Sequence, residues 1–341
     1  MQSDILCQLP AALLPWYAAN RRDLPWRQTK DPYRIWLSEI MLQQTRVEAV
    51  KGYYSRFLQA LPTVGDLARV EDGVLLKLWE GLGYYSRARN LKKAAGVILE
   101  RHHGVFPGQY EEVLALPGVG EYTAGAICSI AFGQKTAAVD GNVLRVYSRL
   151  MADATPIDSP AFKKQVRREL EAIYPQQAGD FTQALMELGA TVCGPNRKPD
   201  CGNCPCRAFC RGFAAGVAEA LPVKPPKKPR REEEKTVLIL RCEGQYALVK
   251  RPDTGLLAGM WQFPERPGKM ELAQVLQTLD GIREVYRQVE KNHIFTHIEW
   301  KMRGFYLEMS EKSGEYQWFT PEEIEKEASL PTAFRQFWEA F

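Results

Sequence analysis

The sequence has 341 residues with 45 Lys and Arg, 41 Asp and Glu and eight Cys, and 45% of its residues are hydrophobic. This length indicates roughly two domains. The hydrophobic fraction is that of a globular protein, which excludes wholesale disorder and collagen-like repetition. No apolar run approaches the roughly 20 residues that span a bilayer, and residues 1–10 lack the pattern of a secretory signal. We therefore expect a cytoplasmic protein with no membrane association, whose thiols stay reduced or bind a metal.

The net charge of +4 is unevenly distributed along the chain. Residues 241–341 carry 13 basic and 16 acidic side chains, which leaves a net charge of +7 for residues 1–240. A polyanion is therefore expected to meet mainly the first part of the chain.

Before residue 220 apolar residues recur at helical spacing, as in Trp36, Leu37, Ile40 and Met41. One acid, Glu39, lies inside this segment. The pattern alone favours a carboxylate on the solvated edge of an amphipathic helix over a buried functional acid.

Residues 116–120 read Leu-Pro-Gly-Val-Gly and precede an apolar segment of helical character at residues 121–127. Two glycines allow backbone conformations that other residues avoid, and N–H groups at a helix start can hold a phosphate without reading sequence. We expect a phosphate contact at Gly118, Val119 and Gly120.

Five of the eight Cys fall within residues 193–210, in the pattern Cys-x7-Cys-x2-Cys-x-Cys-x3-Cys. So dense a set of thiols in a reducing compartment predicts a metal site. A single Cys-x2-Cys pair flanked by single Cys favours an iron–sulfur cluster over zinc. Cys7, Cys128 and Cys242 stand alone among apolar residues and are expected in the core.

Residues 221–231 contain four prolines and five basic residues, which exclude a helix or a central strand. They predict a semi-extended basic linker over residues 221–233, either a solvated tether or a direct phosphate contact.

After the linker the pattern becomes strand-like at residues 236–241 and 246–250, with a turn at Glu243. In residues 298–309 the alternation changes phase at Arg303 and Gly304, which predicts a β-bulge, and helices return near residues 321–327 and 331–341.

The cysteine pattern, the 116–120 turn and Asp140 occur in the order in which the endonuclease III/MutY superfamily of DNA glycosylases has them, and they resemble that family. The resemblance implies an all-helical helix-hairpin-helix domain over residues 1–220. It also implies a 4Fe-4S cluster on four of the cysteines: Cys193, Cys201, Cys204 and Cys210. The first gap has seven residues where the family usually has six, and Cys206 is an additional thiol that could replace a neighbouring ligand.

Members with lyase activity carry a Lys in the hairpin helix that forms a Schiff base with the sugar. In this sequence Tyr122 occupies that position, which disfavours lyase chemistry.

Residues 24–27, 36–45, 81–85 and 139–142 are similar to the corresponding segments of the MutY adenine DNA glycosylases, and the match runs from about residue 12 to residue 215. The resemblance implies that Glu39 protonates adenine, because a carboxyl group in an apolar pocket has a raised pKa. It implies that Asp140 stabilises the oxocarbenium-like sugar, with Asn142 and Tyr122 shaping the site.

The substrate base must leave the duplex before it can react. The resemblance assigns Gln44 and Tyr84 to wedge positions that fill the gap, although Tyr84 also fits an ordinary core aromatic. Thr45 ends the same motif and is assigned to the DNA contact. Arg27 and Gln183 match positions that line the adenine pocket, and Gln183 also fits an exposed helix position.

Residues 255–264 resemble the entry to a Nudix fold, so we expect a Nudix-like mixed α/β domain over residues 234–341. Residues 265–290 lack the Arg-Glu-x2-Glu-Glu run that binds Mg²⁺ in Nudix hydrolases, which indicates recognition instead of hydrolysis.

Residues 293–297 resemble the MutY loop that probes 8-oxoguanine, with Thr296 in place of Ser. This resemblance implies that Phe295, Thr296 and His297 read the lesion. The alternative is that Phe295 belongs to the core and the two His cap a strand.

Together the resemblances imply a monomeric, monofunctional glycosylase that removes adenine opposite 8-oxoguanine or G in double-stranded DNA. Two alternatives remain. A thymine glycosylase acting at T:G shares the Tyr122 pattern, but such enzymes commonly lack a C-terminal domain. A non-catalytic lesion-binding protein would not need both Glu39 and Asp140.

Overall fold

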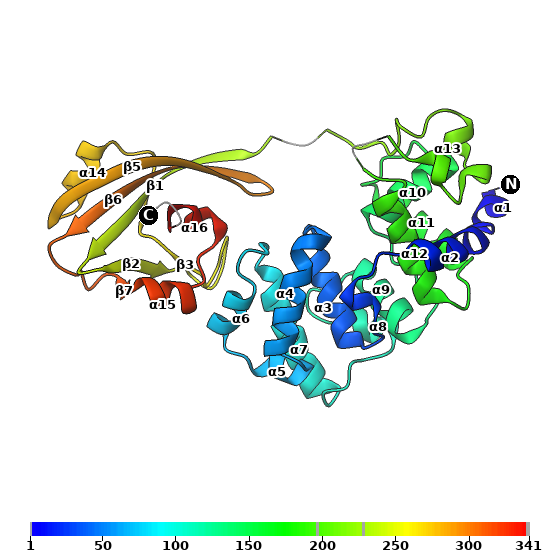
Figure 1. Cartoon of the computed structure of the whole chain (residues 1–341), viewed down its shortest axis with the longest axis horizontal. Coiled ribbons are helices and arrows are strands. Elements are labelled where there is room, and N and C mark those ends of the chain that lie inside the picture. The colour runs from blue at the N-terminus through cyan, green and yellow to red at the C-terminus, as the bar shows by residue number, and fades with distance from the viewer. Residues whose placement is uncertain (1, 196–197, 227–228, 339–341) are drawn as a thin grey trace. The chain divides into compact units, whose positions relative to one another are not determined.

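The computed structural model describes residues 2–195, 198–226 and 229–338, and it divides into two compact units (Figure 1). The first unit comprises Met1–Arg69 and Asn90–Pro226, and the second comprises Val70–Arg89 and Lys227–Phe341. The predicted fold class, a helical part followed by a mixed α/β part, is confirmed. In the described ranges no helix is both long enough and apolar enough to cross a membrane.

The helices up to residue 226 are short to medium in length and are joined by turns and loops of varied length. In chain order they are α1 (Gln2–Leu6), α2 (Leu9–Asn20), α3 (Pro32–Leu42), α4 (Val47–Ala60), α5 (Val64–Arg69), α6 (Asp72–Leu78), α7 (Ser86–Arg101), α8 (Tyr110–Leu114), α9 (Glu121–Phe132), α10 (Gly141–Met151), α11 (Pro160–Glu171), α12 (Ala178–Thr191) and α13 (Arg211–Ala214), with 3-10 turns η1 (Pro25–Arg27), η2 (Cys201–Asn203) and η3 (Arg207–Phe209).

Helix α3 is buried on nearly all sides, which differs from the amphipathic helix that its sequence suggests. Asp31 caps its start by accepting a hydrogen bond from the Tyr33 backbone N–H at 2.9 Å, and Pro32 sets the first turn. Every residue from 35 to 41 is buried, Glu39 included, because the helix packs against both α4 and α9. The solvated-edge alternative for Glu39 is therefore wrong.

The predicted hairpin is formed by α8 and α9, joined by the glycine-rich turn. Gly118 has a φ of +76°, and a Cβ at this position would approach the Asn90 side chain to 2.6 Å, so the turn requires glycine. Gly120 is the N-cap of α9 and brings no side chain to its first N–H groups. This local structure has the form expected for a phosphate contact.

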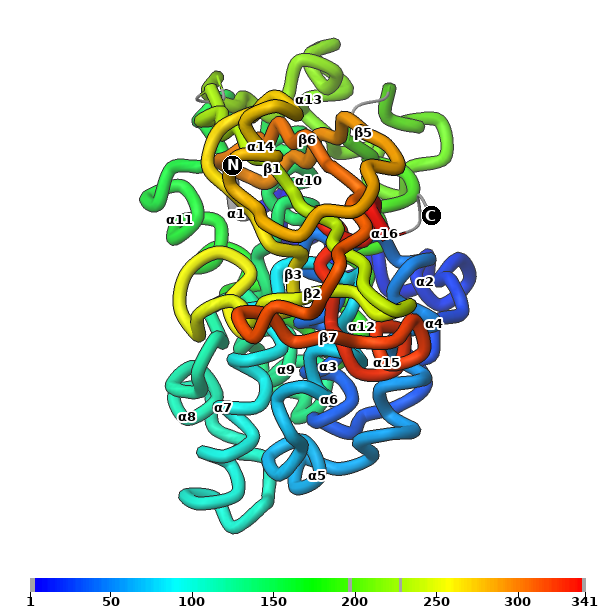
Figure 2. Tube along the Cα trace, turned by 90° about the vertical axis from the view of Figure 1, so that its left-hand side faces the viewer, coloured from blue at the N-terminus to red at the C-terminus, as the bar shows by residue number. Residues whose placement is uncertain are grey.

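The second unit is built around a mixed sheet with the strand order β3-β2-β1-β6-β5, in which β1 and β6 are parallel and β5 and β6 are antiparallel. Figure 2 shows the traces of β1, β6 and β5 passing beside one another. Its elements are β1 (Arg231–Cys242), β2 (Gln245–Lys250), β3 (Trp261–Gln262), β4 (Glu265–Pro267), α14 (Leu272–Thr278), β5 (Ile282–Ile294), β6 (Ile298–Met309), β7 (Gln317–Phe319), α15 (Pro321–Lys326) and α16 (Thr332–Trp338). The predicted turn at Glu243 joins β1 to β2.

The bulge predicted at Arg303 and Gly304 is wrong, because both residues keep regular pairing with β5. The phase change has another cause. One face of β6 contributes Trp300, Met302 and Tyr306 to a core that includes residues of α15 and α16, and the other contributes Phe305 and Leu307 to a core that includes Val275 of α14. The strand passes from burial on one face to burial on both, and the register shifts lie in β5 instead.

Gly304 leaves the space that the ring of Phe337 occupies, since a Cβ there would lie 2.5 Å from the Phe337 Cε1. We expect Gly304→Ala to lower the free energy of unfolding by about 2 kcal/mol through overpacking. Gly314→Ala is the matched control, because its Cβ would meet nothing within 4 Å. Thermal melting of the two variants checks this, and equal melting temperatures would contradict the packing of β6 against α16.

Strand β1 begins at Arg231, before the predicted end of the linker at residue 233. The prolines end at Pro229, so later residues have N–H groups for a sheet, and the Arg231 N–H donates to the His297 carbonyl at 3.0 Å. At the other end the linker is attached to the first unit, where the Leu221 carbonyl accepts from Arg149 Nε at 2.9 Å.

Residues 70–89 belong to the second unit, which the sequence does not predict. Lys77 Nζ donates to the carbonyls of Ile324 and Ala328 at 3.3 and 3.1 Å, and an Arg89 guanidinium nitrogen donates to the Ala258 carbonyl at 2.7 Å. These long-range hydrogen bonds explain why the segment clusters with the C-terminal part of the chain.

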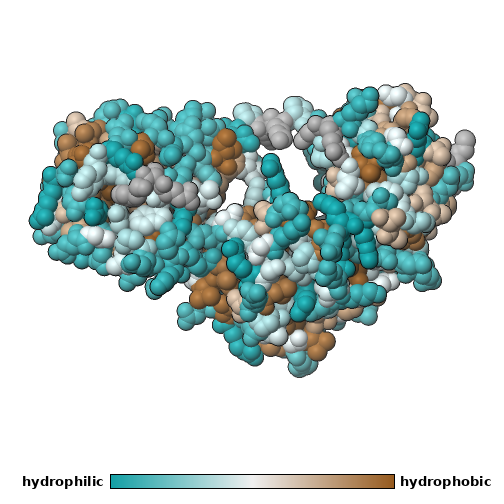
Figure 3. Space-filling model, viewed as in Figure 1, coloured by the Kyte–Doolittle hydropathy of each residue, from teal (hydrophilic) through white to brown (hydrophobic). Residues whose placement is uncertain are grey.

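The face shown in Figure 3 is mostly hydrophilic, with hydrophobic side chains in small separate patches. Cys128 and Cys242 are buried as predicted. The core prediction for Cys7 is wrong, because Cys7 lies in the turn between α1 and α2 and is exposed.

Candidate active site

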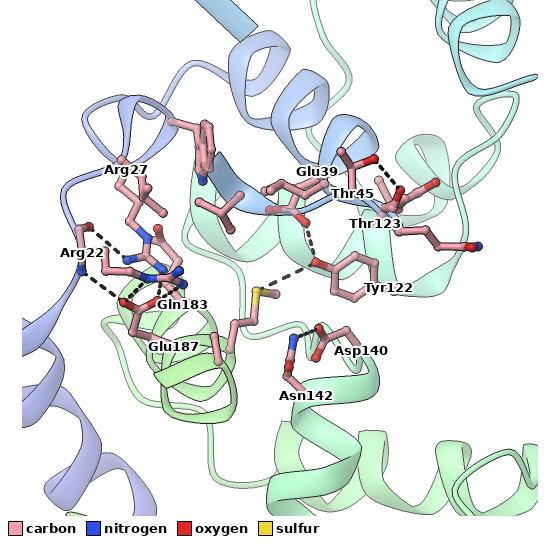
Figure 4. Close-up of a pocket in the computed structure, with 18 of the residues that line it drawn as sticks. Arg22, Arg27, Glu39, Thr45, Tyr122, Thr123, Asp140, Asn142, Gln183 and Glu187 are labelled. Carbon is pink, nitrogen blue, oxygen red and sulfur yellow. Dashed lines mark hydrogen bonds and ion pairs between the residues drawn. The ribbon is translucent and has the colours of Figure 1, made fainter. Parts of the chain in front are cut away.

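A cavity of about 650 Å³ in the first unit brings together all four predicted catalytic residues and five of the predicted DNA- or base-contacting residues (Figure 4). Its walls come from η1, the end of α3 and the turn after it, the starts of α9 and α10, and α12. Nine predicted site residues line it: Arg27, Glu39, Gln44, Thr45, Gly120, Tyr122, Asp140, Asn142 and Gln183. Gly118 and Val119 lie in the adjacent turn and are not among the lining residues.

Glu39 is a buried carboxyl group held by one hydroxyl. It is 6% exposed, and Tyr122 donates its hydroxyl to Glu39 Oε2 at 2.5 Å. Burial raises the pKa of Glu39 to about 7, the Tyr122 hydrogen bond lowers that pKa, and the nearby Asp140 charge raises it. Burial also raises the pKa of Tyr122 well above 10, so its hydroxyl remains a donor. Near neutral pH the site therefore holds an exchangeable proton on Glu39.

Asp140 accepts hydrogen bonds through both of its carboxylate oxygens. Oδ1 accepts from the Val143 N–H at 2.8 Å and so caps α10, while Oδ2 accepts from Asn142 Nδ2 at 2.6 Å. Burial raises the pKa of Asp140 above its ordinary value, and these donors, which favour the ionised form, offset only part of that increase. Arg145 in turn donates to Asn142 Oδ1 at 2.8 Å and, through Nε, to the Cys193 carbonyl at 2.8 Å, so hydrogen bonds connect Asp140 with the cysteine loop.

A third carboxylate, Glu187 on α12, lines the same cavity and was not predicted from the sequence. Its side chain is fully buried and pairs at 2.7 Å with both Arg22 and Arg27. Although burial raises the pKa of Glu187, the hydrogen bonds from the two arginines outweigh it and lower the pKa to about 2. One cavity thus holds a carboxyl group with a pKa of about 7 and another with a pKa of about 2, the separation typical of acid–base sites.

We expect Glu187→Gln to destabilise the protein by about 3 kcal/mol, because two arginines lose a buried counter-charge. The pKa of Glu187 is about 2 in the folded state against 4.5 ordinarily, so its stabilisation is present above pH 4.5 and is lost as the pH falls toward 2. Urea unfolding measures both effects. Glu48→Gln is the control, since Glu48 is 78% exposed in its ion pair with Lys51 and should change stability by under about 1 kcal/mol.

The two predicted wedge residues share an unusual backbone conformation. Gln44 has a φ of +57° and Tyr84 a φ of +47°, a region that residues other than glycine rarely occupy. Gln44 is exposed beside the cavity, and Tyr84 lies in the second unit with 45% of its surface exposed, so the core alternative for Tyr84 is wrong. Strained, exposed positions of this kind occur at functional sites.

Residues 295–297 form the turn between β5 and β6 in the second unit, where they line a cavity of about 530 Å³ together with Tyr84. Phe295 is half-buried against Trp300, with ring centroids 4.8 Å apart, whereas Thr296 and His297 are exposed. The Tyr84 hydroxyl lies 2.9 Å from Thr296 Oγ1. Phe295 therefore anchors the turn through its ring, as expected if it belonged to the core, and Thr296 and His297 present exposed polar side chains.

The four predicted ligand cysteines are partly buried at the end of α12 and in the loop that follows it. Cys193 and Cys210 contact Arg149, whose guanidinium lies 3.4 Å from the Cys193 Sγ and whose carbonyl lies 3.5 Å from the Cys210 Sγ. Cys206 is 3% exposed and belongs to the helical core. The structure does not describe residues 196 and 197 of this loop, and in the part that it describes no three His, Cys, Asp or Glu side chains are grouped to hold a single metal ion. Four thiols remain a donor set suited to an iron–sulfur cluster.

Two family models match the chain. The model of the helix-hairpin-helix (HhH-GPD) superfamily of base excision DNA repair proteins matches residues 37–176, and the model of the NUDIX domain matches residues 236–340. Among solved structures, the helical part is similar to a thermostable thymine-DNA glycosylase, with a TM-score of 0.57 and 30% identity over 63% of this chain and 99% of that one. Endonuclease III in a trapped complex with DNA shares the fold, with a TM-score of 0.52 and 24% identity over 62% of this chain and 98% of that one.

Curated relatives extend over both parts of the chain. The adenine DNA glycosylase of Arabidopsis thaliana is 39% identical over 74% of this chain, which spans only 46% of that relative's length. The adenine DNA glycosylase of Homo sapiens is 35% identical over 97% of this chain and 73% of the relative, and that of Buchnera aphidicola is 33% identical over 84% and 82%. The chain therefore belongs to the adenine DNA glycosylase family.

Proposed function

We propose that this protein removes adenine from double-stranded DNA where adenine is paired with 8-oxoguanine or G, by acid-assisted hydrolysis of the N-glycosidic bond. The observation that carries the proposal is the presence, in one cavity, of the buried Glu39, whose pKa is raised to about 7, and the hydrogen-bonded Asp140. The family membership of the chain supports the choice of adenine.

Glu39 is the proposed general acid. Adenine leaves slowly as an anion, so protonation of a ring nitrogen lowers the barrier to bond breaking, and general acids of this kind contribute about 10²–10⁴-fold. Tyr122 donates to Glu39 Oε2, which leaves Oε1 to carry the transferable proton. Arg27 and Gln183 line the same cavity and are proposed to contact the flipped base, with Glu187 holding Arg27 in place.

Asp140 is the proposed electrostatic partner of the sugar. As the bond to adenine breaks, the deoxyribose gains positive charge, which a carboxylate in a partly buried site stabilises strongly. Asn142 and the Val143 N–H orient this carboxylate, so it needs no rearrangement during the reaction. Tyr122 offers no amine for a Schiff base, which supports a glycosylase without lyase activity.

Recognition of the opposite base is proposed for the second unit. Thr296 and His297 present polar groups from an anchored turn, and Tyr84 lies within hydrogen-bond distance of Thr296. Gln44 and Tyr84 are proposed to fill the space that the flipped adenine leaves, while Thr45, Gly118, Val119 and Gly120 are proposed to hold the DNA backbone.

Cys193, Cys201, Cys204 and Cys210 are proposed to hold a 4Fe-4S cluster, which supplies a cross-link between α12 and its loop and no step of base release. The partly buried thiols and the adjacent Arg149 support this assignment. Purified protein is expected to contain about four iron atoms per chain and to be brown. One zinc per chain in a colourless protein would contradict the assignment.

A panel of duplexes tests the function. The protein is incubated with A:8-oxoguanine, A:G, T:G and A:T duplexes, and strand scission is measured with and without alkali. We expect alkali-dependent scission of the adenine strand with A:8-oxoguanine and A:G only. Release at T:G without release at A:8-oxoguanine would support a thymine glycosylase, and scission without alkali would contradict the role assigned to Tyr122.

A further inference from the structure

The turn at residues 295–297 is held from outside by the end of the linker. Arg230 Nε donates to the Phe295 carbonyl at 3.1 Å, and the Arg231 N–H donates to the His297 carbonyl at 3.0 Å. Within the turn, the Phe295 N–H donates to the Ile298 carbonyl at 2.8 Å. The carbonyls of Phe295 and His297 are therefore fixed by consecutive residues, Arg230 at the end of the linker and Arg231 at the start of β1.

The Phe295 ring provides a further point of attachment. Its centroid lies 4.5 Å from that of His293 and 4.8 Å from that of the buried Trp300, both with edge-on geometry. Ring and carbonyl together determine where the next residue lies. These contacts therefore also place the Thr296 hydroxyl, which lies 2.9 Å from the Tyr84 hydroxyl.

Arg230 and Arg231 are adjacent and equally charged, but their side chains have different partners. The Arg231 side chain pairs with Glu233, and only its backbone N–H reaches the turn. The Arg230 guanidinium itself contacts the turn and lines the same cavity as Tyr84 and Thr296. If the two arginines served only to attract DNA phosphates, their side chains would not need different partners.

We infer that Arg230 is a positioning residue for recognition of the base opposite adenine: by fixing the Phe295 carbonyl it sets the place of the Thr296 hydroxyl. The inference deepens the proposed function and rests on it. It assigns a role in base specificity to a residue of the linker, a segment whose sequence predicts only a tether or a phosphate contact.

The test compares Arg230→Gln, Arg230→Lys and Arg231→Gln. The readout is the ratio of single-turnover rates on A:8-oxoguanine and A:G duplexes, with each rate measured at saturating protein. Arg230→Gln is expected to lower this ratio about fivefold, as the loss of one hydrogen bond allows. Arg230→Lys, which keeps a charged donor, restores most of the ratio, and Arg231→Gln leaves it unchanged because the backbone N–H remains. The A:G rate of each variant shows whether the protein remains folded and active.

Hydrogen–deuterium exchange supplies a readout that does not depend on DNA recognition. The peptide covering residues 293–300 is expected to exchange faster in Arg230→Gln than in Arg231→Gln. An unchanged ratio in Arg230→Gln, an equal fall in both Gln variants, or unchanged exchange would overturn the inference. A wild-type ratio near one would contradict the proposed reading of 8-oxoguanine, and the exchange rates would still decide whether Arg230 positions the turn.

Discussion

Glu39→Gln is expected to slow adenine release by about 10³-fold while leaving the affinity for the duplex within about twofold of wild type. The amide keeps the shape of the side chain and can still accept the Tyr122 hydroxyl hydrogen bond, but it has no proton to give at neutral pH. Single-turnover adenine release and duplex binding measure the two quantities separately. Release at a near-normal rate would exclude Glu39 as the acid.

Tyr122→Phe provides the companion measurement. The Tyr122 hydrogen bond lowers the pKa of Glu39, so its removal should raise the pH at which activity is lost while reducing the rate less than Glu39→Gln does. This shift separates an acid tuned by Tyr122 from a carboxyl group that merely supports the cavity wall. A Tyr122→Phe profile that loses activity at a lower pH than wild type would count against the assigned hydrogen bond.

Asp140→Asn is expected to reduce adenine release by about 10²-fold, because the developing positive charge on the sugar loses its counter-charge. The fold should survive, since asparagine is also a good N-cap and can accept from the Val143 N–H. Asp31→Asn is the matched control: Asp31 caps α3 through the Tyr33 N–H and does not line the cavity. If both variants lost activity equally, capping and not catalysis would explain the effect.

The sequence around Glu39 does not reveal what surrounds this acid in the folded protein. The pattern around Glu39 is compatible with a solvated edge, and only the resemblance to a glycosylase family reverses that interpretation. The run at residues 184–190 carries the same signal, one glutamate among apolar residues, and Glu187 proves equally buried. At both positions a lone acid in an apolar helical run therefore marks a buried carboxyl group. The sequence does not reveal the partners of Glu187, because Arg22 and Arg27 lie about 160 residues away in the chain.

The remaining differences also come from long-range packing. The alternation in β6 suggests a bulge because a single strand does not reveal that a second core covers its other face. The membership of residues 70–89 in the second unit depends on hydrogen bonds such as that of Lys77 to the Ala328 carbonyl. Helix starts and turns were better predicted, as at α9 and at Glu243, because glycine and capping residues act locally.

The pH dependence of adenine release from an A:8-oxoguanine duplex tests the central claim most directly, because it reports the protonation state of the acid itself. Burial raises the pKa of Glu39 to about 7, and we propose that the protonated form is the active one. The single-turnover rate should therefore be constant below that pH and fall about tenfold for each pH unit above it. A rate that stays constant or rises between about pH 7 and 9 would contradict a catalytic proton on Glu39.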